Sequence, residues 1–122
     1  MVPSGFSTAT PWLPLGEENL ARAVDAQEED PGSLLNFTRA MLALRKENGA
    51  LRHGGMELLL ADEGRLVFRR DADGSALLCM FNLSAEAAVW PQEFAPKGEI
   101  VAAVNGAAIG TLPAYGALII RE

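Results

Sequence analysis

The chain has 122 residues, 49% of them hydrophobic and 21% charged, a composition typical of a globular domain rather than a disordered chain. The net charge of −6 and the scattered positions of the ten Lys and Arg residues argue against binding to nucleic-acid phosphates. No apolar run approaches the roughly 20 residues of a membrane span, and the N-terminus lacks the features of a secretion signal, so we expect a cytoplasmic protein with no nucleic-acid or membrane partner.

The first 30 residues are expected to be mainly irregular. The stretch GFSTATPWLPL, from Gly5 to Leu15, contains two prolines, and proline cannot lie inside a helix because it lacks an amide donor. The run ENLARAVDAQEED that follows is rich in Ala, Leu and Glu, and it predicts a turn or two of helix.

The segment 31–49 carries a strong helical pattern. Asp30 is expected to cap this helix and Pro31 to occupy its first position. Arg45 and Lys46 suit the last turn of a helix, and Gly49 is expected to terminate it. Apolar residues recur at helical spacing between these ends and form one stripe. The stripe consists of Leu34, Phe37, Met41 and Leu44, widened by Leu35 and Leu42.

From residue 55 the period of hydrophobicity changes to that of strands. MELLLADEGRLVFRRDADGSALLCMFNLS predicts three strands separated by turns at ADEG and DADG, with Met56, Leu58 and Leu60 on one face. Leu77–Phe81 is apolar throughout, which is typical of a central strand covered on both sides. EAAVW, EIVAAVNG and YGALIIRE predict further strands, and Asn105–Gly106 predicts a tight turn. The expected fold class is α+β and mainly β: an N-terminal loop and one long helix, then an antiparallel β-sandwich of about six strands.

Few residues are of the types that carry chemistry. Cys79 is the only cysteine and lies in the apolar run ALLCMF, so we expect a buried and inert thiol. His53 is the only histidine and has no metal-ligand spacing around it. We therefore expect neither a metal nor a cofactor.

Three motifs resemble a known family. GFSTATPWLPL, then VDAQEEDPGSLLNFTRAMLALRKENGALRHG, then ALLCMFNLS are similar to the C-terminal part of α-glucosidases of glycoside hydrolase family 13, the α-amylase clan. The resemblance includes the oligo-1,6-glucosidases and the trehalose-forming relatives. It extends to LPAYGALII, which resembles the last strand of the family's C-terminal sheet.

The resemblance implies a division of the chain into three parts. Residues 1–30 would be the remnant of the loop after the last strand of a (β/α)8 barrel, 31–49 the last barrel helix, and 55–122 the C-terminal β-sandwich. The family's catalytic carboxylates, which act by a retaining mechanism, lie at the ends of barrel strands that have no counterpart in this sequence. No catalytic residue is therefore assigned, and this chain alone is not expected to be an enzyme.

The function implied is that of a non-catalytic structural domain of an α-glucosidase. Leu34, Phe37, Met41 and Leu44 would face the catalytic barrel or a second copy of the chain. The alternatives are a carbohydrate-binding module acting in trans and one piece of a split α-glucosidase. Trp12 is the candidate substrate-binding residue, with packing of its loop onto the barrel as the competing interpretation. Because the chain has only two Trp and one Tyr, widely separated, we do not expect it to bind glucans.

Overall fold

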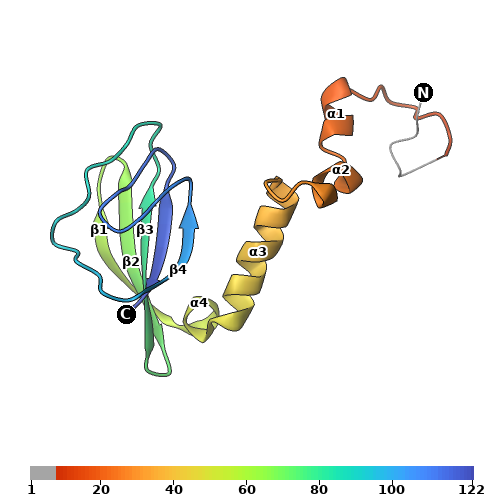
Figure 1. The fold of residues 1–122 in the computed structure, drawn as a ribbon. Helices are drawn as coiled ribbons and strands as arrows, with labels where there is room; N and C mark the ends of the chain where they lie inside the picture. Colours follow the sequence, from red (N-terminus) through yellow and green to blue (C-terminus); the bar gives the residue numbers. More distant parts are fainter. Residues whose placement is uncertain (1–7) are drawn as a thin grey trace. The chain divides into compact units, whose positions relative to one another are not determined.

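The computed structural model describes residues 8–122 (Figure 1). Gly5, Phe6 and Ser7 of the first motif lie outside the described residues. The chain divides into two units, residues 1–47 and 48–122. No helix in the described part of the chain has the length and hydrophobicity needed to cross a membrane.

The described part of the first unit contains three helices. Two short ones, α1 (Glu17–Ala21) and α2 (Val24–Glu29), form where the sequence predicts a turn or two of helix. The third, α3 (Leu34–Glu47), lies within the predicted segment 31–49. Arg45 and Lys46 occupy its last turn, as predicted, where cations stabilise the helix dipole.

Both ends of α3 differ from the prediction. Ser33, rather than Asp30, caps the helix, because its hydroxyl accepts a hydrogen bond from the Asn36 amide at 3.2 Å. The Asp30 carboxylate instead accepts from the Gly32 amide at 2.8 Å, within a turn that keeps Pro31 outside the helix. At the other end Asn48 is extended and Gly49 begins a new helix, so the prediction of Gly49 as a terminator is wrong.

The second unit is a five-stranded antiparallel sheet preceded by α4 (Gly49–His53) (Figure 1). Its order is β1-β2-β3-β5-β4, which places β3 at the centre as predicted. The fold class is confirmed, with five strands rather than six: EAAVW contributes only an isolated bridge between Ala88 and Leu112. The strands are β1 (Gly55–Ala61), β2 (Arg65–Ala72), β3 (Ser75–Asn82), β4 (Glu99–Val104) and β5 (Ala117–Arg121).

Two of the predicted turns are confirmed by their backbone angles. Asp73 and Gly74 have φ of 54° and 78° between β2 and β3. Asn105 and Gly106, directly after β4, have φ of 54° and 76°. Successive positive φ angles define the type I′ turn, whose twist matches that of paired strands and which Asn-Gly and Asp-Gly favour.

The two faces of the sheet bury separate apolar clusters. Side chains that are paired across strands share a face, and the face of Val67, Met80 and Leu118 is covered by loop residues. Those loop residues are Trp90, Ala107 and Leu112. The opposite face buries Leu77 and Cys79 against Ala50 of α4. Loops therefore cover one face of the sheet and a short helix covers part of the other, and residues 8–122 form no second sheet against it.

A β-bulge changes the predicted pattern of β1. The pairing of β1 with β2 shifts between Leu58 and Leu60, so the alternation of faces is interrupted there. As a result Leu59 and Leu60 both pack against the loop-covered cluster, whereas Met56 and Leu58 are exposed. The prediction that Met56, Leu58 and Leu60 share one face is therefore wrong, because the bulge places Leu60 on the opposite face from Leu58.

Asn82, at the end of β3, joins the sheet to the covering loops. Its side chain is only 2% exposed. The amide nitrogen donates to the carbonyls of Glu86 at 2.7 Å and Pro113 at 2.8 Å. The amide oxygen accepts from the backbone and the hydroxyl of Ser84 at 3.0 and 2.8 Å. Two loops distant in sequence are thereby fixed to one buried side chain.

Candidate functional site

The strongest candidate for a binding surface is the apolar stripe of α3. Residues three and four apart lie on one face of a helix, so Leu34, Phe37, Met41 and Leu44 form a continuous row. Leu34 is 73% exposed, Phe37 is exposed, and no side chain of α3 is buried. Leu42, beside the row, is also exposed. The described residues therefore present an apolar helix face of the kind that marks an interaction surface.

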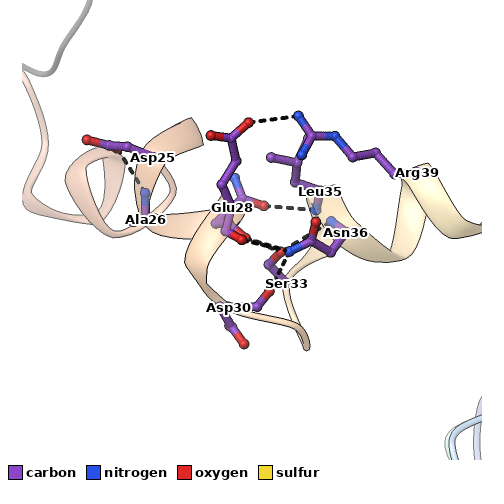
Figure 2. A network of polar contacts seen from close by, with 9 residues as sticks. Asp25, Ala26, Glu28, Asp30, Ser33, Leu35, Asn36 and Arg39 are labelled. Carbon is purple, nitrogen blue, oxygen red and sulfur yellow. Dashed lines mark hydrogen bonds and ion pairs between the residues drawn. The ribbon is translucent and has the colours of Figure 1, made fainter.

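The start of α3 is fixed by a polar corner, which we define as Gln27, Glu28, Asp30, Ser33 and Asn36 (Figure 2). The amide nitrogen of Asn36 donates to the carbonyls of Gln27 at 2.9 Å and Asp30 at 2.8 Å. The hydroxyl of Ser33 donates to the Gln27 carbonyl at 2.7 Å. These bonds satisfy the Gln27 carbonyl in the last turn of α2 and the Asp30 carbonyl at its C-cap, groups that a helix end otherwise leaves without partners.

The side chain of Gln27 extends this corner in both directions. Its oxygen accepts from the Leu35 amide at 3.1 Å, and its nitrogen donates to the Arg22 carbonyl at 2.7 Å. An ion pair between Arg39 and Glu28 at 2.9 Å lies at the edge of the corner and is half exposed, so it adds little stability. The corner sets the direction in which α3 leaves α2, and with it the direction of the apolar stripe.

Sequence reasoning did not identify Gln27 and Asn36 as part of this corner. The signal available was Ser33 followed three residues later by Asn36, which resembles the spacing of a capping box. The side chains of Ser33 and Asn36 donate to carbonyls several residues upstream, and no local pattern specifies such partners.

Trp12 lies in an irregular segment and is 90% exposed. Leu13 beside it is also exposed. Among residues 8–47, no side chain covers its ring. The alternative, packing of the Trp12 loop onto the barrel, stays a prediction, and Gly5, Phe6 and Ser7 of that loop lie outside the described residues.

The acidic residues before α3 do not form a catalytic arrangement in the described part of the chain. Glu17, Glu18, Asp25, Glu28, Glu29 and Asp30 are all exposed. A retaining glycosidase needs two carboxyl groups in a water-excluding site about 5–5.5 Å apart. Within residues 8–122 no group of three or more His, Cys, Asp or Glu side chains is arranged to hold a metal ion.

The surroundings of three further side chains, Cys79, His53 and Trp90, indicate no role in binding or catalysis. Cys79 is buried at the centre of the sheet, and burial raises the pKa of its thiol to about 11, so the reactive thiolate is disfavoured. His53 is exposed and lies 3.3 Å from Asp73. Trp90 is buried and donates to the Phe94 carbonyl at 2.9 Å, so its ring is part of the core.

A shallow depression near the first hairpin contains two charged side chains that are paired with each other. The guanidinium of Arg65 donates to the carboxylate of Asp62, and this bond lowers the pKa of Asp62 from 3.8 to about 2. Arg65 also donates to the Val89 carbonyl at 2.9 Å and so ties the hairpin to a covering loop. The depression is lined by Asp62, Glu63, Gly64, Arg65, Ala88 and Val89.

Comparison with known proteins relates the helix and the sheet to one group of enzymes. The chain is 45% identical over 84 residues to a probable α-glucosidase of Rhizobium meliloti (strain 1021), covering 69% of this chain and 15% of that protein. It is 37% identical over 92 residues to the probable oligo-1,6-glucosidase 2 of Bacillus subtilis (strain 168), covering 73% of this chain and 16% of that protein. No family model matches the chain.

The chain is part of a glycoside hydrolase family 13 enzyme.

Solved structures agree with this assignment. The structure of the α-glucosyl transfer enzyme XgtA matches 96% of this chain with a TM-score of 0.76 and 34% identity, over 23% of its own length. A mutant of the trehalulose synthase MUTB matches 97% of the chain with a TM-score of 0.78, and at 23% identity it supports the fold alone. The chain spans about 15% of the length of the curated α-glucosidase it matches. It therefore represents one part of a family 13 enzyme.

Proposed function

We propose that this chain is a non-catalytic structural domain of an α-glucosidase and that the apolar stripe of α3 binds the catalytic barrel. The observation that supports this role is the row of Leu34, Phe37, Met41 and Leu44, none of them buried, on a helix whose start is fixed by the polar corner. Burial of one large apolar side chain is worth roughly 1.5–3 kcal/mol. A row of four therefore provides enough free energy to hold a domain against its neighbour.

The relatives support the same role. Their names describe α-glucosidases and oligo-1,6-glucosidases, and the chain matches only about 15% of the α-glucosidase from Rhizobium meliloti. Hydrolysis by a retaining mechanism would then belong to the barrel of the whole enzyme. The domain would contribute by covering an apolar surface of that barrel.

A binding experiment with a barrel fragment tests the proposal. The fragment would be the Rhizobium meliloti α-glucosidase without the segment that matches this chain. We expect the two to co-elute in size-exclusion chromatography with light scattering, and Phe37→Asp to abolish the complex. Lys46→Ala, which changes an exposed side chain in the last turn of α3, is the matched control and is expected to bind normally.

The same experiment separates the alternatives. A compact dimer of the isolated chain that Phe37→Asp dissociates would identify a second copy as the partner. Recovery of glucoside hydrolysis on mixing would support a split enzyme. If the wild-type chain neither binds the fragment nor dimerises, the docking role of the stripe is wrong.

One observation favours contact with sugar at a different place. Trp12 is almost fully exposed, and an aromatic ring can stack on the apolar face of a glucose unit. In the whole enzyme we expect this contact at the entrance of the substrate site. Calorimetry of the assembled enzyme and its Trp12→Ala variant with maltose and isomaltose tests it, and equal affinities would contradict it.

A further inference from the structure

The chain contains Asn-Gly at two places, Asn48–Gly49 and Asn105–Gly106. Asn-Gly is the dipeptide most prone to spontaneous deamidation, because glycine has no side chain to hinder attack of its nitrogen on the Asn side chain. Both pairs belong to the second unit of the chain. Their surroundings differ in ways that affect both the rate of this reaction and its effect.

Asn105 and Gly106 form the centre of an exposed type I′ turn. The turn is closed by a hydrogen bond from the Ala107 amide to the Val104 carbonyl at 3.2 Å. Both central residues are exposed, and the side-chain amide of Asn105 donates to the Tyr115 carbonyl at 2.8 Å. This hydrogen bond holds the Asn105 amide in place, and it must break before the side chain can react.

A small motion brings the reacting atoms of this turn together. Rotation of the peptide unit between Asn105 and Gly106 changes only ψ of the first residue and φ of the second, and it interconverts type I′ and type II′ turns. The strand ends remain in place, and glycine accepts either sign of φ. A Cβ at Gly106 would meet only Pro113 at 3.9 Å, so there is room for the rotation.

The peptide unit between Asn48 and Gly49 is less free to rotate. Its backbone is extended, with φ −112° and ψ 106°, and Gly49 is the first residue of α4. Ala50, the next residue, is 3% exposed and packs in the apolar cluster beneath the sheet. Rotating the Asn48–Gly49 peptide would displace α4 from that cluster, so the motion needed for attack costs buried apolar contacts.

We infer that Asn105 is the preferred deamidation site of this domain and that the product loosens the loop anchored at Tyr115. The Gly106 nitrogen attacks Cγ of Asn105, the new N–C bond forms, and the Cγ–N bond breaks. Ammonia leaves with the proton from the Gly106 amide. Water then opens the succinimide at either carbonyl and gives aspartate or isoaspartate, with no change of oxidation state.

The product cannot make the bond that Asn105 makes. A carboxylate has no proton to donate at neutral pH, so it faces the Tyr115 carbonyl with like partial charge. Tyr115 has φ 52°, an unfavourable angle for a bulky residue, and its side chain is 59% exposed. Two hydrogen bonds hold this backbone: the one from Asn105 and the one from the Tyr115 amide to the Ser84 carbonyl at 3.0 Å. Deamidation removes the first of them.

At Asn48 the contact with Arg121 would survive the same reaction. The Asn48 side-chain oxygen accepts from the guanidinium of Arg121 at 3.1 Å. Aspartate retains that acceptor and adds a negative charge, which strengthens a hydrogen bond to a cation. The two Asn-Gly sites thus differ in both reaction rate and structural consequence.

Peptide mapping of the full chain tests the preference. The protein is incubated in mildly alkaline buffer, digested with trypsin and analysed by mass spectrometry. Cleavage after Lys46 and Arg52 isolates Asn48, and cleavage after Lys97 and Arg121 isolates Asn105. We expect the Asn105 peptide to be converted several-fold faster in the folded protein and the two rates to converge in concentrated urea. Equal rates in the folded protein, or faster conversion at Asn48, would overturn the inference.

Two variants of Asn105, compared with a control variant of Asn48, test the consequence without waiting for the reaction. Asn105→Asp is expected to lower the unfolding midpoint and to increase hydrogen exchange at Tyr115 and Gly116. Asn48→Asp, the matched control, is expected to leave both unchanged or to raise the midpoint. Asn105→Gly keeps the turn but lacks the side-chain donor, so it should also raise exchange at Tyr115. Unchanged exchange in both Asn105 variants would contradict the role of this bond.

Discussion

The two units of the chain are stabilised by different interactions. The sheet unit buries two apolar clusters, one on each face. Among the described residues of the first unit the one buried side chain is that of Ser33, and polar bonds to Gln27 and Asn36 surround it. Polar bonds orient helices but add only about 0.5–1.5 kcal/mol each. The first unit therefore has a defined local geometry without an apolar core among its described residues, as expected of a segment completed by a partner.

The largest expected effect is the loss of stability when a large apolar side chain is truncated in the sheet unit but not in the first unit. Leu118 is fully buried in the loop-covered cluster, so Leu118→Ala should lower the free energy of unfolding by ~2–5 kcal/mol. Leu34→Ala, at an exposed position of α3, should change it by less than ~0.5 kcal/mol. Urea unfolding followed by fluorescence measures both. Similar losses in the two variants would mean that α3 is buried in the isolated chain.

The second prediction concerns the buried polar side chain of the sheet unit. Asn82→Ala removes the donor shared by the carbonyls of Glu86 and Pro113, and it also removes the acceptor of the Ser84 amide. We expect a loss of about 1–3 kcal/mol, measured by urea unfolding. Asn36→Ala in the polar corner provides the comparison, because the Asn36 side chain also donates to two backbone carbonyls but lies in the first unit. The stability of the sheet unit should be unaffected by that change.

The third prediction weakens the polar corner of the first unit. Ser33→Ala removes the cap of α3 and should cost the helix about 1 kcal/mol, seen as reduced helicity in far-UV circular dichroism. Ser33→Asp retains an acceptor for the Asn36 amide but loses the donor to the Gln27 carbonyl, so it should restore only part of the helicity. If Ser33→Ala changes nothing, the cap does not control the start of α3.

The smallest expected effect is a pH dependence within the sheet unit. The folded-state pKa of Asp62 is lowered from 3.8 to about 2 by the hydrogen bond from Arg65. Its contribution to stability is therefore present above the unfolded pKa and is lost as the pH falls from 3.8 through about 2. Thermal unfolding of Asp62→Asn should show a shallower decline over this range. Glu63→Gln, the neighbouring exposed position, should follow the wild type.

Elements with a strong local pattern are predicted correctly from the sequence. The period-2 runs predict β1, β2 and β3, the Asp-Gly and Asn-Gly pairs predict their turns, and the helical stripe predicts α3. Leu77–Phe81 is recognisable as a central strand because it is apolar on both faces. In each of these segments the local sequence and the final packing require the same conformation.

The incorrect predictions concern features that depend on distant partners. EAAVW has the composition of a strand, but it pairs only at Ala88, and Trp90 is instead buried in the core beneath the loop. The bulge at Leu58 is set by pairing with β2 and has no local signature. Of the candidate site, the stripe is visible from spacing, whereas the polar corner is not, because its acceptors are carbonyls whose position depends on the fold.

The single cysteine can be used to measure how often the sheet opens. Cys79 lies in the central strand with its thiol shielded, and there is no second thiol to complicate the signal. A thiol-trapping reagent can reach it only when the strands on either side separate, so the labelling rate measures the frequency of that event. Under conditions where closing is faster than labelling, the same rate yields the equilibrium population of the open sheet. The buried thiol of Cys79 thus provides a direct kinetic assay of the stability of the sheet unit.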